Sequence, residues 1–238
     1  MKNPIALVFD TETIDLQDKR CFDIGWTVGN LNTGEILCNE SFLVEDIFNT
    51  SIYRKAFFYN QNNSFYQAAL EVNTIEVRNI LAIRLAMNKA IVDYGANIIS
   101  AFNIKFDINA LNATYVYFNK IDTTHIDKEK EKLYKEMSVA SLSKKFQVID
   151  IPLVFAHAVE AKYGKFCKEH DFLTAKGYIS TKVDHINKYL VSMDYNESHT
   201  AGKDSMDEFN ILYKYWGKTD KWKDGKGMAW KILKERGF

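Results

Sequence analysis

Two carboxylates follow directly after a short apolar run near the N-terminus. The run covers residues 5–9, and Asp10 and Glu12 come next with one residue between them. Side chains alternate along a strand, so both carboxylates would point to the same face. Two acids at the end of a buried strand repel each other unless a cation compensates, and their oxygens suit Mg²⁺ or Mn²⁺. Taken alone, this common spacing favours the simpler interpretation, two solvated acids at a strand end.

Two further segments place acids and a histidine at the boundaries of expected elements. Asp107 follows a second apolar run and would sit in the first turn of a helix, where the helix dipole favours a negative charge. His199 precedes the last long helix, and Asp204 lies on that helix. The simpler interpretations are an ordinary helix acid and an exposed histidine. The other histidines are expected to be structural or exposed: His125, His157, His170 and His185.

The periodicity of apolar residues predicts the elements that would position these groups. Strands are expected at 5–9, 21–29, 35–44, 97–101 and 146–151, with a hairpin turn at 30–34. Helices are expected at 74–94, 105–118, 128–137 and 202–216. A three-stranded meander followed by alternating helices and strands is typical of an α/β fold with a mixed sheet. Residues 45–73 and 119–145 are expected to be insertions.

The acids and the histidine, taken in order, resemble the motifs of one nuclease family. Phe9-Asp10-Thr11-Glu12-Thr13 matches its first motif, and Asn103 with Phe106-Asp107 matches its second. His199, five residues before Asp204, matches its third. The chain therefore resembles the DEDDh family, the DnaQ-like 3′–5′ exonucleases, over residues 4–216. The related subfamily wants tyrosine four residues before the last acid, where this chain has Thr200.

The resemblance implies a fold, a set of ligands and a reaction. The fold would be an RNase H-like mixed five-stranded sheet, three antiparallel strands first, flanked by helices. The reaction would be two-metal hydrolysis that removes mononucleotides from a 3′ end, with His199 as general base. Two divalent cations, Mg²⁺ or Mn²⁺, would be held by Asp10, Glu12, Asp107 and Asp204.

The same resemblance implies residues that bind the substrate. The backbone at Thr11 and Thr13 would contact the terminal sugar. Ile14 and Phe102 would contact terminal bases, and Asn103 would bind the strand backbone or brace a ligand loop. Family members usually continue the first motif with a Thr-Gly-Leu-like stretch, whereas this chain has Thr13-Ile14-Asp15-Leu16, so its chemistry is better defined than its substrate.

Several activities are compatible with these motifs. Single-stranded DNA or DNA ends are the first choice of substrate. An exoribonuclease of the same family is the nearest alternative, because discrimination rests on contacts to the 2′-OH that sequence does not locate. A non-catalytic nucleic-acid-binding or polymerase-associated module and an RNase H-like endonuclease are the others. The protein is further expected to bind a polymerase or another replication protein, to form a homodimer and not to associate with a membrane.

Composition adds weaker indications. There are 31 basic and 31 acidic residues, so net charge does not indicate a nucleic-acid-binding protein. Three scattered cysteines and an N-terminal apolar run too short for a signal peptide predict an intracellular, cytoplasmic protein. The abundance of Asn, Lys, Ile and Tyr suggests an AT-rich genome, such as that of a phage or a low-GC bacterium, and a phage product would work in the host cytoplasm. Residues 217–238 form a basic extension with seven basic and three acidic side chains, which either contacts phosphates or packs Trp222 and Trp230 on the domain.

Overall fold

A six-stranded mixed sheet is the centre of the protein. The structure is a computed structural model that describes residues 3–121, 138–224 and 228–238. β1 (Ile5–Thr13), β2 (Cys21–Asn30) and β3 (Ile36–Val44) form an antiparallel meander. β5 (Ile98–Ala101) and β6 (Gln147–Asp150) continue the sheet in parallel on the other side of β1. The prediction of an α/β fold with a mixed sheet is confirmed.

The expected number of strands was too low. The order is β4-β3-β2-β1-β5-β6, and β4 (Glu76–Arg78) pairs in parallel with β3. Sequence periodicity had assigned residues 74–94 to a single helix. Instead, α3 (Ile80–Asp93) begins after Asn79, whose side chain accepts a hydrogen bond from the backbone N–H of Ala82 at 2.9 Å. This N-cap separates the helix from a strand that is too short to show a period of its own. The helix expected at 128–137 lies outside the described residues.

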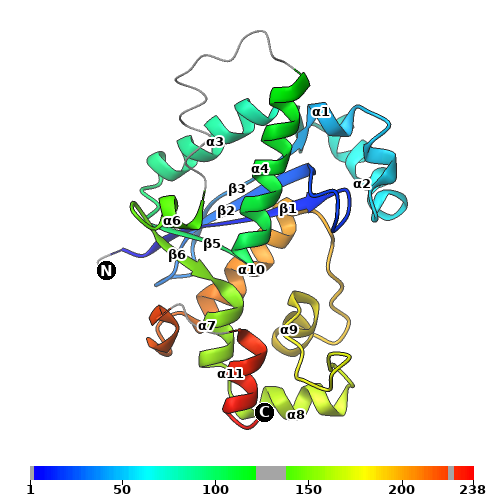
Figure 1. The fold of residues 1–238 in the computed structure, drawn as a ribbon. Helices are drawn as coiled ribbons and strands as arrows, with labels where there is room; N and C mark the ends of the chain where they lie inside the picture. The colour runs from blue at the N-terminus through cyan, green and yellow to red at the C-terminus, as the bar shows by residue number, and fades with distance from the viewer. Residues whose placement is uncertain (1–2, 122–137, 225–227) are drawn as a thin grey trace.

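Helices cover both faces of the sheet. In Figure 1, α4 (Ile104–Ile121) crosses in front of the strands and α10 (Ala201–Tyr215) lies behind them. Leu7 and Phe9 of β1 join the core on the side of α3 and α4, whereas Ala6 and Val8 join the core of α10. By the same alternation, Asp10 and Glu12 point to the α10 side.

The segment expected as the first insertion folds against the far end of the meander. It contains α1 (Glu45–Phe48), the 3-10 turn η1 (Tyr53–Lys55) and α2 (Tyr59–Glu71). Tyr53 and Tyr66 from this segment pack on Phe22 of β2, with ring centroids 5.0 and 6.0 Å from it. Figure 1 shows these elements beyond the tip of β1. The second expected insertion is described only in part, with α6 at Val139–Leu142.

The C-terminal half builds a second helical layer that includes the basic extension. Its helices are α7 (Ile151–Ala158), α8 (Ala161–Glu169), α9 (Val183–Leu190), the 3-10 turn η2 (Lys221–Asp224) and α11 (Ala229–Glu235). Trp222 is buried, Trp230 stacks on Tyr178 with centroids 4.8 Å apart, and the Arg236 guanidinium donates to the carbonyl oxygens of Ala156 and Val159. The tryptophans of residues 217–238 therefore pack on the domain.

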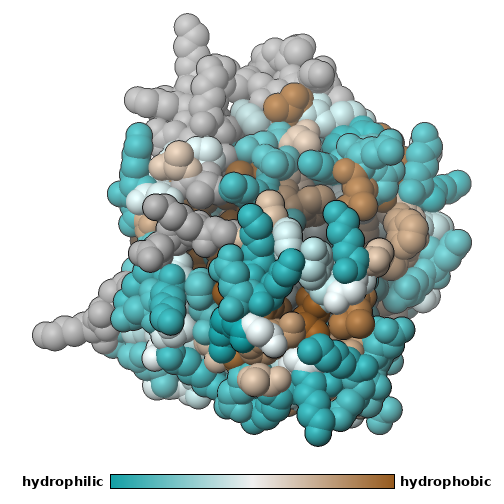
Figure 2. Space-filling model, turned by 60° about the horizontal axis from the view of Figure 1, so that its bottom comes forward, coloured by the Kyte–Doolittle hydropathy of each residue, from teal (hydrophilic) through white to brown (hydrophobic). Residues whose placement is uncertain are grey.

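The surface shows hydrophobic residues in separate groups. The face brought forward in Figure 2 is mainly hydrophilic, with groups of hydrophobic residues between the polar ones. The most exposed large apolar side chains of the described residues include Leu16 and Phe57, which are 80% and 79% exposed. Among the helices of the described ranges, none has the length and apolar character that a bilayer crossing requires.

Gly25 allows β2 and the start of α10 to touch. A Cβ atom on Gly25 would lie 2.3 Å from the backbone nitrogen of Gly202 and 2.4 Å from the carbonyl carbon of Ala201. Gly25 is also the partner of Asp10 in the β1–β2 ladder. Because only glycine permits this approach, Gly25 sets how closely α10 lies to the acidic strand.

Replacing Gly25 with alanine is expected to lower the free energy of unfolding by about 3 kcal/mol, the upper part of the usual cost of overpacking. The added methyl group meets backbone atoms that no side-chain rotation can move away. Urea denaturation measures the loss. Gly177→Ala is the control, because its Cβ meets nothing within 4 Å and only its positive φ of 74° adds strain. Equal losses in the two variants would contradict the close approach.

Candidate metal centre and its acidic surroundings

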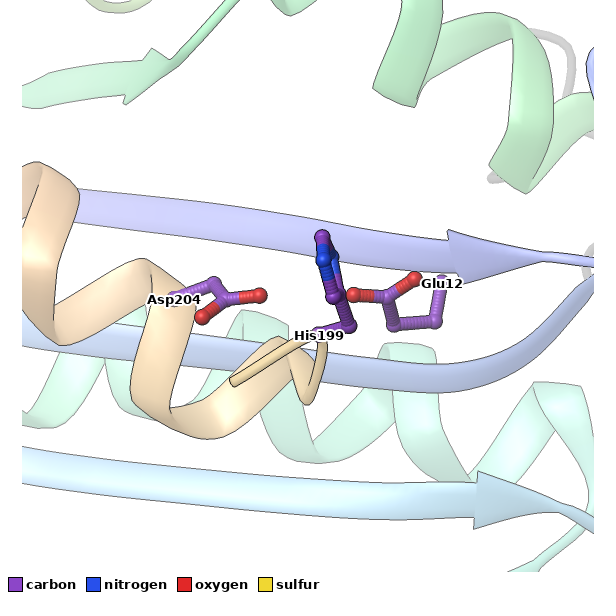
Figure 3. Close-up of side chains that lie close together, drawn as sticks. All are labelled: Glu12, His199 and Asp204. Carbon is purple, nitrogen blue, oxygen red and sulfur yellow. The ribbon is translucent and has the colours of Figure 1, made fainter. Parts of the chain in front are cut away.

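Three potential metal ligands converge where β1 meets the start of α10. Glu12 comes from β1, Asp204 from the first turn of α10, and His199 from the loop before that helix. One ligand atom from each lies within 4.8 Å of those of the other two. Figure 3 shows the imidazole standing between the two carboxyl groups. Carboxylate oxygens with one imidazole nitrogen form a donor set that suits a divalent cation.

Hydrogen bonds orient the α10 side of this group. Ser198 Oγ donates to Asp204 Oδ1 at 2.8 Å and lies 2.9 Å from the hydroxyl of Thr200. Asp204 is buried, and its place in the first turn lets the helix dipole favour its negative charge. His199 has a left-handed backbone with φ of 54°. The loop and the helix start therefore present His199 and Asp204 in one direction.

The other two expected ligands surround this group without joining it. Asp107 lies in the first turn of α4, is 2% exposed and accepts a 2.9 Å hydrogen bond from Thr11 Oγ1. Burial raises the pKa of Asp10, and negative charges at Glu208, Glu12, Asp107 and Asp204 raise it further. The structure thus brings the four expected acids into one electrostatic neighbourhood, in which Glu12 and Asp204 form the close group with His199.

A fifth carboxylate, Glu208, was missed by the sequence interpretation. Glu208 lies one helical turn after Asp204 and is 3% exposed. Its Oε2 accepts a hydrogen bond from the backbone N–H of Phe102 at 3.1 Å, which ties α10 to the residue after β5. Its negative charge is the first among those that raise the pKa of Asp10. The i, i+4 spacing from Asp204 was the available signal, because residues so spaced share one helix face.

Burial makes these acids resist ionisation. It raises the pKa of Asp204 to about 6 and that of Asp107 to about 7. Glu197, half-buried nearby, has its pKa raised to about 7 by burial and then by the charge of Asp204. A divalent cation would reverse these shifts, because an opposite charge favours the ionised form. The donor set and its electrostatics therefore fit such a cation.

The residues expected to bind substrate lie in different environments. Thr11 is buried and donates to Asp107, and Thr13 Oγ1 donates to the carbonyl oxygen of Asp15 at 3.3 Å. Phe102 is half-buried against the core of the second layer. Asn103 is exposed with φ of 69°, and its backbone N–H donates to Asp150 Oδ1 at 2.9 Å. A hydrogen bond to its backbone thus holds the turn after β5, and the Asn103 side chain lies at the surface.

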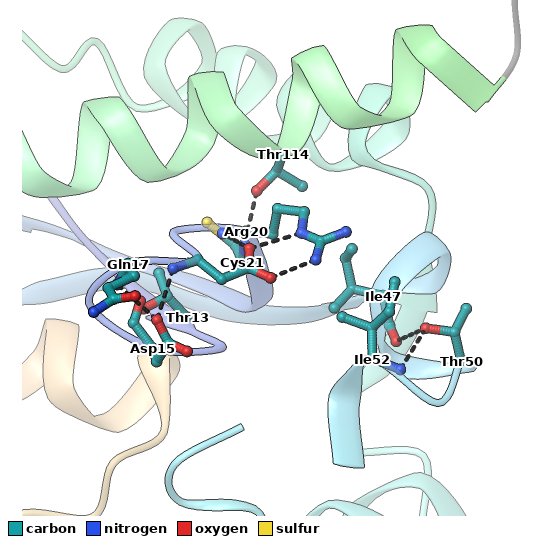
Figure 4. Close-up of polar contacts among 10 residues, drawn as sticks. Thr13, Asp15, Gln17, Arg20, Cys21, Ile47, Thr50, Ile52 and Thr114 are labelled. Atoms are coloured by element: carbon teal, nitrogen blue, oxygen red, sulfur yellow. Dashed lines mark hydrogen bonds and ion pairs between the residues drawn. The ribbon is translucent and has the colours of Figure 1, made fainter. Parts of the chain in front are cut away.

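Ile14 lies elsewhere than expected. Its side chain is 2% exposed and belongs to the core beneath the sheet, so it offers no surface to a terminal base. The reason is that β1 continues to Thr13, and the chain turns inward before its loop. Leu16, with 80% of its surface exposed, is the exposed apolar residue of this loop. Asp15 is turned into the loop, where its Oδ1 accepts from the backbone N–H of Gln17 at 2.6 Å (Figure 4).

Two comparisons with known proteins found no match. No protein-family model matches the chain, and no curated protein matches it. What can be said of function therefore rests on the arrangement of Glu12, His199 and Asp204 and on the acids around them.

Cation binding is expected to stabilise the protein more at pH 8 than at pH 5. Acids with raised pKa values stabilise the metal-free fold fully below their unfolded pKa near ~4, and this contribution is lost as pH rises through the folded values. For Asp204 and Asp107 those values are about 6 and about 7. Thermal unfolding in EDTA and in MnCl₂ at both pH values measures the difference. Saturation at 100 times Kd would add about 2.7 kcal/mol.

Asp204→Asn is the matched variant for this measurement, because it keeps the shape of the side chain and removes its charge. We expect it to reduce the manganese-dependent rise in melting temperature at pH 8. The same rise at pH 5 and pH 8, or an unchanged rise in Asp204→Asn, would show that the cation binds elsewhere.

Proposed function

We propose that this protein is a metal-dependent 3′–5′ exonuclease with RNase H-like topology, acting on single-stranded DNA ends. The convergence of Glu12, His199 and Asp204 carries the proposal. Asp10 and Asp107 lie in the same acidic neighbourhood. A structural role alone does not call for so many buried and half-buried acids around one histidine, since burying their charges costs free energy.

The sheet supports the RNase H-like part of the proposal. An antiparallel meander is followed by parallel strands beside β1, and the acids lie where β1 ends. β4 is an addition to the five strands of the expected topology and lies at the opposite edge from β6. It pairs only with β3, so it leaves the central strands and their acids unchanged.

Each group has a role in hydrolysis of a phosphodiester. Asp10, Glu12, Asp107 and Asp204 would hold two divalent cations, which supply charge stabilisation for the attacking and leaving oxygens. His199 would stand beside the cations and not bind them, and its imidazole would take the proton from the attacking water. Burial lowers the pKa of His199, so the imidazole is neutral and able to accept a proton at neutral pH. Ser198 and Thr11 would keep Asp204 and Asp107 oriented.

Purified protein is expected to shorten 5′-labelled single-stranded DNA from its 3′ end in Mg²⁺ or Mn²⁺, and EDTA should stop the reaction. Asp10→Asn and Asp204→Asn should abolish it, because each removes a charge that the cations require. Glu235→Gln is the control, an exposed acid on α11 that should leave the rate unchanged. Denaturing gels of the products measure all four proteins.

The same gels separate the competing activities. Internal cuts would favour an endonuclease, and faster shortening of RNA than of DNA would favour an exoribonuclease. Cleavage that survives EDTA or Asp10→Asn would overturn the metal-dependent mechanism. Binding of single-stranded DNA without any cleavage would favour the non-catalytic module.

A further inference from the structure

The ring of Phe58 lies flat against the imidazole of His199. The centroids are 3.8 Å apart and the planes meet at 11°. Phe58 directly precedes α2, in the segment that sequence analysis treated as an insertion. Phe58 is half-buried, and the histidine covers one face of its phenyl ring. A stacked ring at this distance restricts the rotation of the imidazole, because turning the histidine on this side would drive it into the phenyl ring.

The backbone of His199 is held by the same helix. Asn62 Nδ2 donates to the carbonyl oxygen of His199, and the Tyr66 hydroxyl lies 3.5 Å from that oxygen. Asn62 and Tyr66 are both buried, with 4% and 0% of their surfaces exposed. α2 and the residue before it therefore contact His199 twice: the ring of Phe58 stacks on the His199 side chain, and polar groups of α2 reach the His199 carbonyl oxygen.

A buried acid extends this support to the start of α10. Asp23 Oδ2 accepts from the Tyr66 hydroxyl at 2.8 Å and from the backbone N–H of Ala201 at 3.0 Å. Ser41 Oγ donates to the other oxygen at 2.7 Å. Asp23 thus links α2, β3 and the residue two positions after His199. The hydrogen bonds account for a carboxyl group with no exposed surface.

The left-handed backbone of His199 is a conformation that contacts from neighbouring elements hold in place. Its φ of 54° is unfavourable for a residue with a Cβ atom, by roughly 1–2 kcal/mol, and persists only where neighbouring contacts enforce it. α2 supplies those contacts. The segment just before the helix is attached to the residue that follows the acidic strand, because the backbone N–H of Phe57 donates to the carbonyl oxygen of Ile14 at 3.0 Å.

We infer that Phe58 is a positioning residue that holds the imidazole of His199 toward Glu12 and Asp204, with α2 acting as its rigid support. The inference rests on the proposed function, in which His199 is the general base. Phe58 acts through His199 and needs no contact with the nucleic acid. The segment 45–73 is therefore part of the catalytic arrangement.

A double-mutant cycle tests the coupling. Phe58→Leu keeps an apolar side chain and removes the flat ring, and Phe58→Tyr keeps the ring. His199→Gly removes the imidazole and tolerates positive φ. We expect Phe58→Leu to lower kcat by up to about 100-fold, the scale of a small misplacement at a reacting centre, with KM unchanged. Phe58→Tyr should restore kcat. In the His199→Gly background, Phe58→Leu should have no further effect.

A second measurement is independent of nuclease activity. In ¹H–¹³C spectra, the ring protons of His199, assigned by their loss in His199→Gly, should be shifted upfield by the Phe58 ring. Phe58→Leu should remove this shift and Phe58→Tyr should keep it. Phe58→Met provides a second non-aromatic variant if circular dichroism shows that Phe58→Leu is unfolded.

Two results would overturn the inference. One is an upfield shift that is absent in the wild-type protein or unchanged in Phe58→Leu. The other is an equal loss of kcat from Phe58→Leu with and without His199. A wild-type protein that cleaves no nucleic acid but shows the shift would instead contradict the proposed function and leave the stacking contact established.

Discussion

Burial of several like charges in one place is the constraint on which the rest of the protein depends. The charges that act on Asp10 come from Glu208, Glu12, Asp107 and Asp204, all of the same sign. An ionised carboxylate in a buried site is unfavourable unless an opposite charge accompanies it, so these groups either keep their protons or meet a cation. Hydrogen bonds from Thr11, Ser198 and the backbone satisfy individual oxygens and leave the total charge unbalanced. A divalent cation bound among these acids would balance that charge.

The fold concentrates the acids by bringing backbones unusually close. Gly25 of β2 lies opposite Asp10 in the ladder and directly against the start of α10, so the helix that carries Asp204 and Glu208 packs closely on the strand that neighbours the acidic strand. Phe58, just before α2, stacks on His199 at one side of the site. Asp23 joins α2 to the start of α10 by accepting hydrogen bonds from both. Stability and site geometry therefore depend on the same contacts, and weakening one is expected to disturb the other.

The parts of this arrangement that follow from local periodicity could be predicted from the sequence. A short stretch of sequence is enough to show the i, i+2 spacing of Asp10 and Glu12 and the helix start before Asp204. The three-stranded meander could be predicted in the same way. β4 was missed because three residues show no period. The support of His199 was missed because Asn62 lies 137 residues away, a contact that only the tertiary fold creates. Glu208 could have been found from its spacing to Asp204, and Ile14 was misplaced because the inward turn after β1 leaves no sequence signal.

Anomalous diffraction from crystals grown with Mn²⁺ tests the central claim most directly, because it locates the cation without relying on activity. We expect manganese peaks bounded by the carboxyl oxygens of Glu12 and Asp204, with Asp10 or Asp107 turned toward them, and we expect these peaks to disappear in Asp204→Asn. Saturated crystals with no peak at this site, or with manganese bound only at exposed acids elsewhere, would contradict the claim that the buried carboxylates form a metal centre.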